Sequence, residues 1–174
     1  MQSIIYKGPG KFAIEDRPKP IIKKADDVMI KVLGVCICGT DINIFATPQK
    51  HPSRPGIIFG HEFCGQVVEV GEAVTSLKPG DKVIVDPHGP CGYCDACRAG
   101  LPEMCKNLYL DEPGLEGQAN AMGVFKDGGL TSYTLVPEKF AYKIAADTPA
   151  ELMALAEPLA CCGYSLEKLN IHVG

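Results

Sequence analysis

The sequence predicts a mainly β domain, a barrel or a sandwich, with short helices and a helical segment at its C-terminal end. Short β-rich runs alternate with Gly and Pro turn signals along the first half, and no long helix separates these runs. Helical spacing appears only near the end of the chain. With 174 residues, of which 46% are hydrophobic, the chain can bury the core of one ordinary domain.

Strands are expected where β-branched and aromatic residues gather between turn signals. The six runs of this kind are Phe12–Glu15, Val28–Val35, Gln66–Val70, Lys82–Val85, Leu130–Val136 and Phe140–Ile144. A cysteine-rich loop, 86–107, follows the fourth run, and the segment 108–127 shows no clear period.

Helical structure is expected from Thr148 onward, because Pro149 is a favourable first residue and the run up to Leu169 has helical spacing. Pro158 should break or restart this helix, which gives two helices around Glu157. The last residues, Asn170–Gly174, are expected to open a new strand.

Charge and composition exclude several classes of partner. The chain has 17 basic and 21 acidic side chains and no basic block, so we expect neither nucleic acid nor a membrane as a partner. No apolar run is long enough to span a bilayer, and the N-terminus lacks a signal peptide. The nine cysteines are an odd number, which favours reduced thiols and a cytoplasmic location.

Four of the cysteines have the spacing of a metal site. Cys91, Cys94, Cys97 and Cys105 form a C-x2-C-x2-C-x7-C run on Gly- and Pro-containing backbone that turns easily. Four thiolates so close in sequence can close a tetrahedron around one soft divalent ion. Such a closed site leaves no position for a substrate, so its expected role is to hold the loop together.

A second set of ligand types lies elsewhere and comprises Cys38, His61, Glu62 and Glu157. A metalloprotease helix would need a second histidine four positions after His61, where Gly65 stands, so that interpretation fails. Thiol, imidazole and carboxylate are all zinc ligands, and three protein ligands leave room for water or substrate. This set therefore predicts an open zinc site.

At this point the sequence resembles the zinc-dependent medium-chain dehydrogenases, which include alcohol, sorbitol and threonine dehydrogenases. The matching segments occur in the family's order and cover nearly the whole chain. They are CGTD from Cys38, GHEFCGQVVEVG from Gly60, KPGDKV from Lys78, CGYCDACRAG from Cys91 with Cys105 beyond it, and EPLA from Glu157.

The resemblance implies a GroES-like barrel over residues 1–150 that is the catalytic domain and carries a zinc lobe at 86–107. Residues 151–174 would be a helical linker and a first strand toward a Rossmann domain that the chain lacks. Two zinc ions are implied, a structural one on the four clustered cysteines and a catalytic one on Cys38 and His61. Glu62 and Glu157 would supply or exchange carboxylate ligation at the catalytic ion. Glu157 in its Glu-Pro-Leu context resembles the polyol and secondary-alcohol branch.

The resemblance also assigns roles beside the metal. Asp41 resembles the carboxylate that orients the histidine ligand. Thr40 resembles the hydroxyl that takes the alcohol proton, and the residues alone also allow Thr40 to be a helix cap before Asp41–Phe45. The family's relay continues to a histidine where this chain has Asn43, which cannot act as a base at neutral pH. His51, in a flexible Pro-rich loop, is an alternative base for this relay, although we favour its interpretation as an exposed bystander.

The complete enzyme implied by the family would use NAD or NADP, act on a small alcohol or polyol, and form a homo-oligomer. No glycine-rich phosphate-binding loop is present, so this chain alone is not expected to transfer hydride. Two alternatives remain open. One is an iron–sulfur module, whose ferredoxin spacing the first three clustered cysteines mimic, and the other is a zinc-folded binding module without catalysis. Cys64, Cys161 and Cys162 are expected to be core or near-site residues.

Overall fold

The computed structural model describes residues 1–111 and 113–169. Its main feature is a five-stranded antiparallel sheet with the strand order β6-β3-β4-β5-β7. These strands are β3 (Asp27–Cys36), β4 (Glu62–Val70), β5 (Lys82–Val85), β6 (Tyr133–Pro137) and β7 (Ala141–Lys143). The expected strand at Asn170–Gly174 lies outside the described residues.

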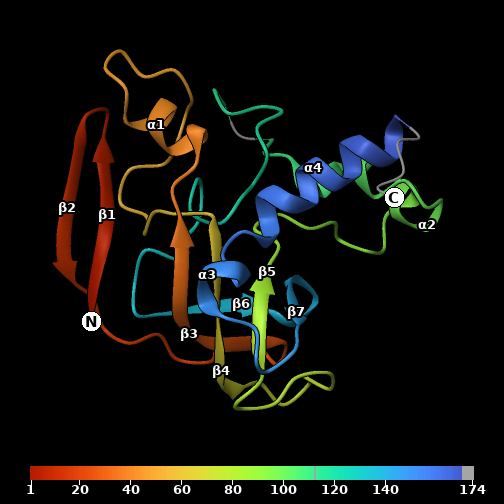
Figure 1. Cartoon of the computed structure of the whole chain (residues 1–174). Coiled ribbons are helices and arrows are strands. Elements are labelled where there is room, and N and C mark those ends of the chain that lie inside the picture. The colour runs from red at the N-terminus through yellow and green to blue at the C-terminus, as the bar shows by residue number, and fades with distance from the viewer. Residues whose placement is uncertain (112, 170–174) are drawn as a thin grey trace.

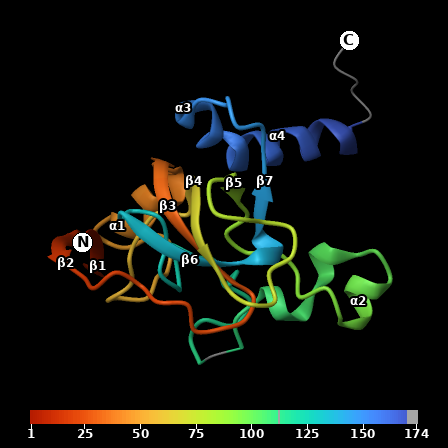
Figure 2. The ribbon, with the colours of Figure 1, turned by 90° about the horizontal axis from the view of Figure 1, so that it is seen from below.

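A two-stranded hairpin, β1 (Gln2–Gly8) and β2 (Lys11–Asp16), flanks the sheet. Isolated bridges join its first strand to the body of the domain, from Ser3 to Thr131 and from Ile5 to Ile58. The hairpin and the lobe that contains α2 (Asp95–Arg98) lie at opposite ends of the molecule (Figures 1 and 2). The remaining short turns are η1 (Pro102–Met104) and η2 (Lys106–Leu108) in this lobe, and η3 (Glu138–Phe140) before β7.

Three helices complete the fold, and two of them, the first and the last, contribute residues to the candidate site. The first, α1 (Gly39–Phe45), follows β3 directly, whereas α3 (Ala150–Met153) and α4 (Ala156–Lys168) close the described chain. Figure 2 shows α3 and α4 one after the other on the same side of the sheet, where α3 contacts β3 and β4 and α4 contacts β4 and β5. No helix in the described part of the chain has both the length and the apolar composition to cross a bilayer.

Hydrophobic side chains from the sheet form the main core. Its members, all buried, are Val28, Ile30, Phe63, Val67, Leu77, Val83, Val85, Met122, Val136 and Ala141. A second core lies under the hairpin, around Tyr6, Phe59 and Phe125. A third joins Cys64 to Met153 and Ala154 of the α3 region, so Cys64 is a core residue as expected. Burial at these positions is the main source of the domain's stability.

The predicted strands are confirmed with shifted ends. The strand β1 is not predicted by the sequence pattern. The strand after Gly60 begins four residues earlier than predicted, because Glu62 and Phe63 lie before Gly65 and do not alternate clearly. The expected helix cap at Thr40 is wrong. The extended residue before the helix is Cys38, with φ −94° and ψ 160°, and Thr40 is already the second helical residue.

Two C-terminal helices are present, as predicted, but the break falls at Ala154 and Leu155 and not at Pro158. Pro158 occupies the third position of α4. The first-turn N–H groups of a helix have no intrahelical acceptor, so a proline there removes no hydrogen bond. Glu157 is therefore held on the first turn of a continuous helix.

Candidate metal centres

The four clustered cysteines meet in the lobe beside α2. Their sulfur atoms all lie within 4.8 Å of one another. The Sγ atom of Cys94 lies 3.5 Å from that of Cys97 and 3.8 Å from that of Cys105, and the sulfurs of Cys91 and Cys97 are 3.9 Å apart. These distances exclude disulfides, whose sulfur atoms are bonded at about 2.05 Å. A tetrahedron with metal–sulfur distances of about 2.3 Å has edges of about 3.8 Å, so the four thiols fit zinc.

The ionisation of these thiols also favours a cation. Burial acts to raise the pKa of Cys91, but hydrogen bonds from backbone N–H groups, first that of Tyr93, lower it to about 5. Burial and the neighbouring sulfur atoms raise the pKa of Cys97 to about 12. The group cannot hold four thiolates without a positive charge among them, because like charges at this spacing repel strongly.

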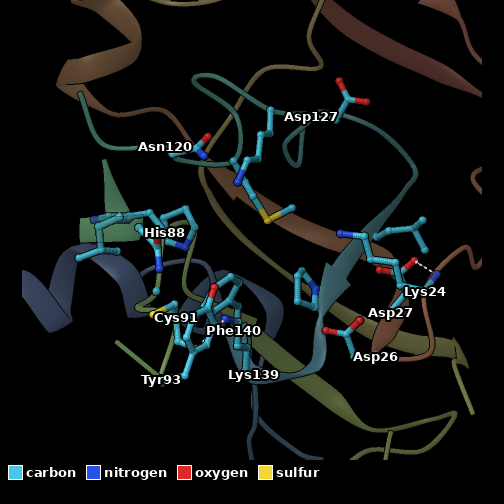
Figure 3. A pocket seen from close by; sticks show the side chains of 18 residues that line it. Lys24, Asp26, Asp27, His88, Cys91, Tyr93, Asn120, Asp127, Lys139 and Phe140 are labelled. Atoms are coloured by element: carbon cyan, nitrogen blue, oxygen red, sulfur yellow. Dashed lines mark hydrogen bonds between the residues drawn. The ribbon is translucent and has the colours of Figure 1, made fainter. Parts of the chain in front are cut away.

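Lys139 ties the lobe to the sheet. Its Nζ atom donates hydrogen bonds to the carbonyl oxygens of Pro90 and Cys91, both at 3.3 Å. Figure 3 shows Cys91, Tyr93, Lys139 and Phe140 together at one end of a polar cavity of about 530 Å³, with Lys24, Asp26 and Asp27 at the other end.

The second ligand group is assembled by the pairing of two strands. In the antiparallel register of β3 and β4, Cys36 faces Glu62. Cys38 follows the last residues of β3, and His61 comes directly before the first residue of β4. Because the two strands are antiparallel neighbours, both residues lie at the same end of this strand pair. One ligand atom from each of Cys38, His61 and Glu62 lies within 4.8 Å of the others.

Close backbone packing fixes the approach of His61. Gly60 has φ +89°, a left-handed conformation that glycine adopts without strain. Its carbonyl oxygen lies so near Gly123 and Gly128 that a Cβ at either position would come within 2.2 Å of it. The histidine is therefore positioned by rigid main chain and not by a mobile loop.

Asp41 connects two of the three candidate ligands. Its Oδ2 atom accepts a hydrogen bond from the backbone N–H of Cys38 at 2.8 Å. Its Oδ1 atom lies 3.2 Å from Nδ1 of His61, which is an ion-pair distance, and neither atom has a hydrogen-bond partner among the described residues. Because Nδ1 faces the carboxylate, Nε2 of His61 is the nitrogen that remains for a metal.

Glu157 lies in the same pocket but outside the tight group. A cavity of about 400 Å³ is lined by Cys38, Thr40, His51, His61, Glu62, Pro87, His88, Ala119, Ala121, Val124, Glu157, Pro158 and Cys161. Glu157 is half-buried and is not among the atoms that meet within 4.8 Å. Cys161 and Cys162, about one helical turn later, are both exposed, but the Sγ atom of Cys161 lies 4.0 Å from Oε1 of Glu157, so Cys161 is near the site.

The pocket is negatively charged around one histidine. Burial acts to lower the pKa of His61, but the carboxylates of Asp41, Glu157 and Glu62 outweigh it and raise this pKa. Burial, and then the Glu62 carboxylate, raise the pKa of Glu157. Burial is also the first cause of the raised pKa of Cys38. Two carboxylates and a thiol around one imidazole fit a divalent cation, which neutralises the excess negative charge.

Sequence reasoning underestimated several residues of this pocket. His51 was interpreted as an exposed bystander, yet it is half-buried and lines the cavity. Ala119, Ala121 and Val124 come from the segment without a clear period, so no pattern could have indicated them. His88 lies in the cysteine-rich loop three residues before Cys91, and that position is its only sequence signal. The structure thus brings Cys38, His61 and Glu62 together and places Thr40 and Glu157 in the same cavity.

A mainly β domain with a four-cysteine lobe and a separate cysteine–histidine–glutamate pocket belongs to the class of GroES-like dehydrogenase domains. Comparison with known proteins makes this specific. The family model described as "Alcohol dehydrogenase GroES-like domain" matches residues 24–146, and the chain belongs to this family of zinc-dependent medium-chain dehydrogenases.

Individual relatives agree with this family. An L-threonine 3-dehydrogenase from Thermococcus kodakarensis is 40% identical over 164 residues, which are 91% of this chain and 43% of that protein. An Escherichia coli CFT073 alcohol dehydrogenase complexed with NADH superposes with a TM-score of 0.78 at 32% identity, over 97% of this chain and 45% of that chain. Zinc dependent alcohol dehydrogenase 2 from Streptococcus pneumonia gives a TM-score of 0.71 at 31% identity, over 95% and 44%. The chain thus spans less than half the length of these relatives.

Proposed function

We propose that this chain is the zinc-binding catalytic part, residues 1–150 with the helical linker after it, of an NAD- or NADP-dependent dehydrogenase that acts on a small alcohol or polyol. The observation that carries the proposal is the meeting of one thiol, one imidazole and one carboxylate in a cavity beside Thr40. Relatives that are threonine and alcohol dehydrogenases support the reaction class.

Two zinc ions per chain are part of the proposal. The four-cysteine lobe would hold a structural ion, and Cys38, His61 and Glu62 would hold a catalytic one. Glu157, which lines the same cavity, would exchange with Glu62 as the carboxylate ligand. When bound, the catalytic ion would lower the pKa of an alcohol hydroxyl so that its proton can leave. Asp41 would hold the His61 ring in its ligating orientation.

The remaining parts of the proposal concern the setting of the enzyme. A nucleotide-binding domain would supply NAD or NADP, because hydride transfer requires the nicotinamide against the substrate carbon. We also propose a homo-oligomeric enzyme in the cytoplasm, where the lobe's thiols stay reduced, and a reaction that needs neither nucleic acid nor a membrane.

Metal content of the purified chain tests the proposal. We expect two zinc ions per chain by elemental mass spectrometry, and one in the Cys38→Ser variant. Cys36→Ser is the matched control, because Cys36 lies two residues earlier, is half-buried and is outside both ligand groups. Iron in place of zinc, or one zinc ion that Cys38→Ser leaves unchanged, would refute the proposal.

Cobalt substitution extends this test to the substrate. Co²⁺ bound by thiolate absorbs visible light, so the Cys38-dependent part of the spectrum reports on this pocket alone. We expect a secondary alcohol to change that part of the spectrum and to leave the lobe's contribution unchanged.

A further inference from the structure

We propose that His51 is the proton acceptor of the candidate catalytic pocket, an inference that rests on the proposed function. An alcohol that is to lose hydride must first lose its hydroxyl proton, so the pocket needs a base that is not itself a metal ligand. The ionisable or charged groups that line the cavity are Cys38, His51, His61, Glu62, His88, Glu157 and Cys161. Setting aside the proposed ligands leaves His51, His88 and Cys161.

The segment around His51 is anchored on both sides. Before it, the backbone N–H of Lys50 donates a hydrogen bond to the carbonyl oxygen of Asn43 at 3.0 Å. After it, the Ser53 hydroxyl and the Arg54 N–H donate to the carbonyl oxygen of Val124, at 2.6 and 3.2 Å. Val124 itself lines the cavity, so these bonds fix His51 against the pocket wall.

A single hydrogen bond selects the tautomer of the neutral His51 ring. Its Nδ1 atom lies 2.8 Å from the carbonyl oxygen of Pro52. A carbonyl can only accept, so Nδ1 carries the hydrogen and, in the neutral ring, Nε2 has a free lone pair. The ring is therefore prepared to accept a proton at Nε2.

The other two candidates, His88 and Cys161, have no contact among the described residues that leaves a basic nitrogen free to accept a proton. Nδ1 of the His88 ring lies 3.8 Å from Oδ1 of Asp86, which is beyond hydrogen-bond distance, so this contact selects no tautomer for His88. The Sγ atom of Cys161 lies 4.0 Å from Oε1 of Glu157, and the sulfur of a neutral thiol is only a weak acceptor. Asn43 is exposed and does not line the cavity.

The proposed step is a simple proton transfer. The O–H bond of the alcohol breaks, an N–H bond forms at Nε2 of His51, and the electron pair stays on the oxygen. Thr40 lines the same cavity, and its hydroxyl can pass the proton between the two atoms. The products are an alkoxide and an imidazolium, so charge and atoms balance.

The tautomer is tested first, without any metal. Two-dimensional NMR of the ¹⁵N-labelled chain, at a pH where histidine side chains are neutral, should show His51 protonated at Nδ1. The His51 signals are assigned as those that disappear in the spectrum of the His51→Asn variant. Observation of the Nε2–H tautomer would overturn the inference, because that nitrogen could then accept no proton.

The transfer is tested in the cobalt-loaded chain with isopropanol as the probe. Proton release is followed with a pH indicator in a stopped-flow instrument. We expect His51→Asn, whose side-chain amide can still donate to the Pro52 carbonyl, to slow proton release at least about tenfold. Added 2,6-lutidine, a hindered base that binds metals poorly, should restore the rate, which a loss of structure alone would not allow.

The matched control is Asn43→Ala, which removes an exposed side chain and leaves its backbone carbonyl for Lys50. It should release protons at the unsubstituted rate. If His51→Asn binds isopropanol normally and releases protons at the unsubstituted rate, the inference is wrong while the proposed function stands. If isopropanol does not change the cobalt spectrum of the unsubstituted chain, the proposed function is refuted and the inference with it.

Discussion

Replacement of Asp41 by asparagine should weaken metal binding in the candidate catalytic pocket and leave the cysteine lobe unaffected. Asp41 is 4% exposed and contacts both sides of the site, the Cys38 N–H through Oδ2 and Nδ1 of His61 through Oδ1. The asparagine amide can keep an oxygen toward Cys38. Its NH₂ group would then face the His61 N–H, donor against donor, and disfavour the tautomer that leaves Nε2 for the metal.

The size of this effect follows from the contact that is lost. The contact is the 3.2 Å approach of the Asp41 carboxylate to Nδ1 of His61, and a charge-assisted contact of this kind contributes about 1.5–3 kcal/mol. At 1.4 kcal/mol for each factor of ten, the predicted loss of metal affinity is about 10- to 100-fold, the range typical for carboxylates that orient a histidine ligand. Competition between the chain and a chromophoric chelator measures this affinity once the lobe is saturated with metal.

Asp27→Asn is the matched control for this experiment. Asp27 is 7% exposed and its Oδ2 atom accepts backbone hydrogen bonds from Lys23 and Lys24, far from the pocket. This variant should lose stability and keep its metal affinity. Unchanged affinity in Asp41→Asn, or an equal loss in Asp27→Asn, would refute the argument that Asp41 orients the ligand.

Three further predictions concern the lobe and the scaffold. Removing metal with a chelator should raise amide hydrogen exchange in 91–108 and leave the sheet protected, because among the described residues of that stretch only Cys94 and Cys105 are buried. An equal rise of exchange in the lobe and in the sheet would contradict this prediction. Glu138→Gln should lower the free energy of unfolding at neutral pH by about 1 kcal/mol, because hydrogen bonds from Thr75 and Ser76 lower the pKa of Glu138 below its usual 4.5. The carboxylate's contribution is present above 4.5 and is lost as pH falls through the lowered pKa, so urea titrations well below 4.5 should show no difference between the two proteins. Gly65→Ala should lower the free energy of unfolding, measured by thermal melts, by about 1–3 kcal/mol, because the new Cβ would lie 2.5 Å from the Lys31 carbonyl oxygen. Gly39→Ala, whose Cβ would have no atom within 4 Å, should leave the melting temperature unchanged.

Local patterns were enough to find most strands and the lobe. The β-rich runs between turn signals correspond to β2 to β7, because strand formation and turn chemistry depend on neighbouring residues. The four lobe cysteines lie within 15 consecutive positions, so their spacing alone predicted that they could meet. The first strand was missed because its two isoleucines and one tyrosine stand together without clear alternation.

Motif resemblance pointed to the pocket residues but could not give their geometry. Cys38 and His61 are far apart in sequence, and they meet because the β3–β4 register sets Cys36 opposite Glu62. The sequence carries no local signal for that register, which is decided by the packing of both strands in the core. Likewise, Glu157 lies in the cavity because α4 packs on β4 and β5.

The sequence by itself determined the β class, the four-cysteine lobe and the family to which the chain belongs. Only the tertiary structure decided that His51 lines the pocket and Asn43 does not. The reason is physical: His51 is held by hydrogen bonds that its neighbours make to Asn43 and Val124, the latter more than 70 residues away. Contacts over such separations form only when the whole domain has folded, so no periodicity or spacing in the sequence indicates them.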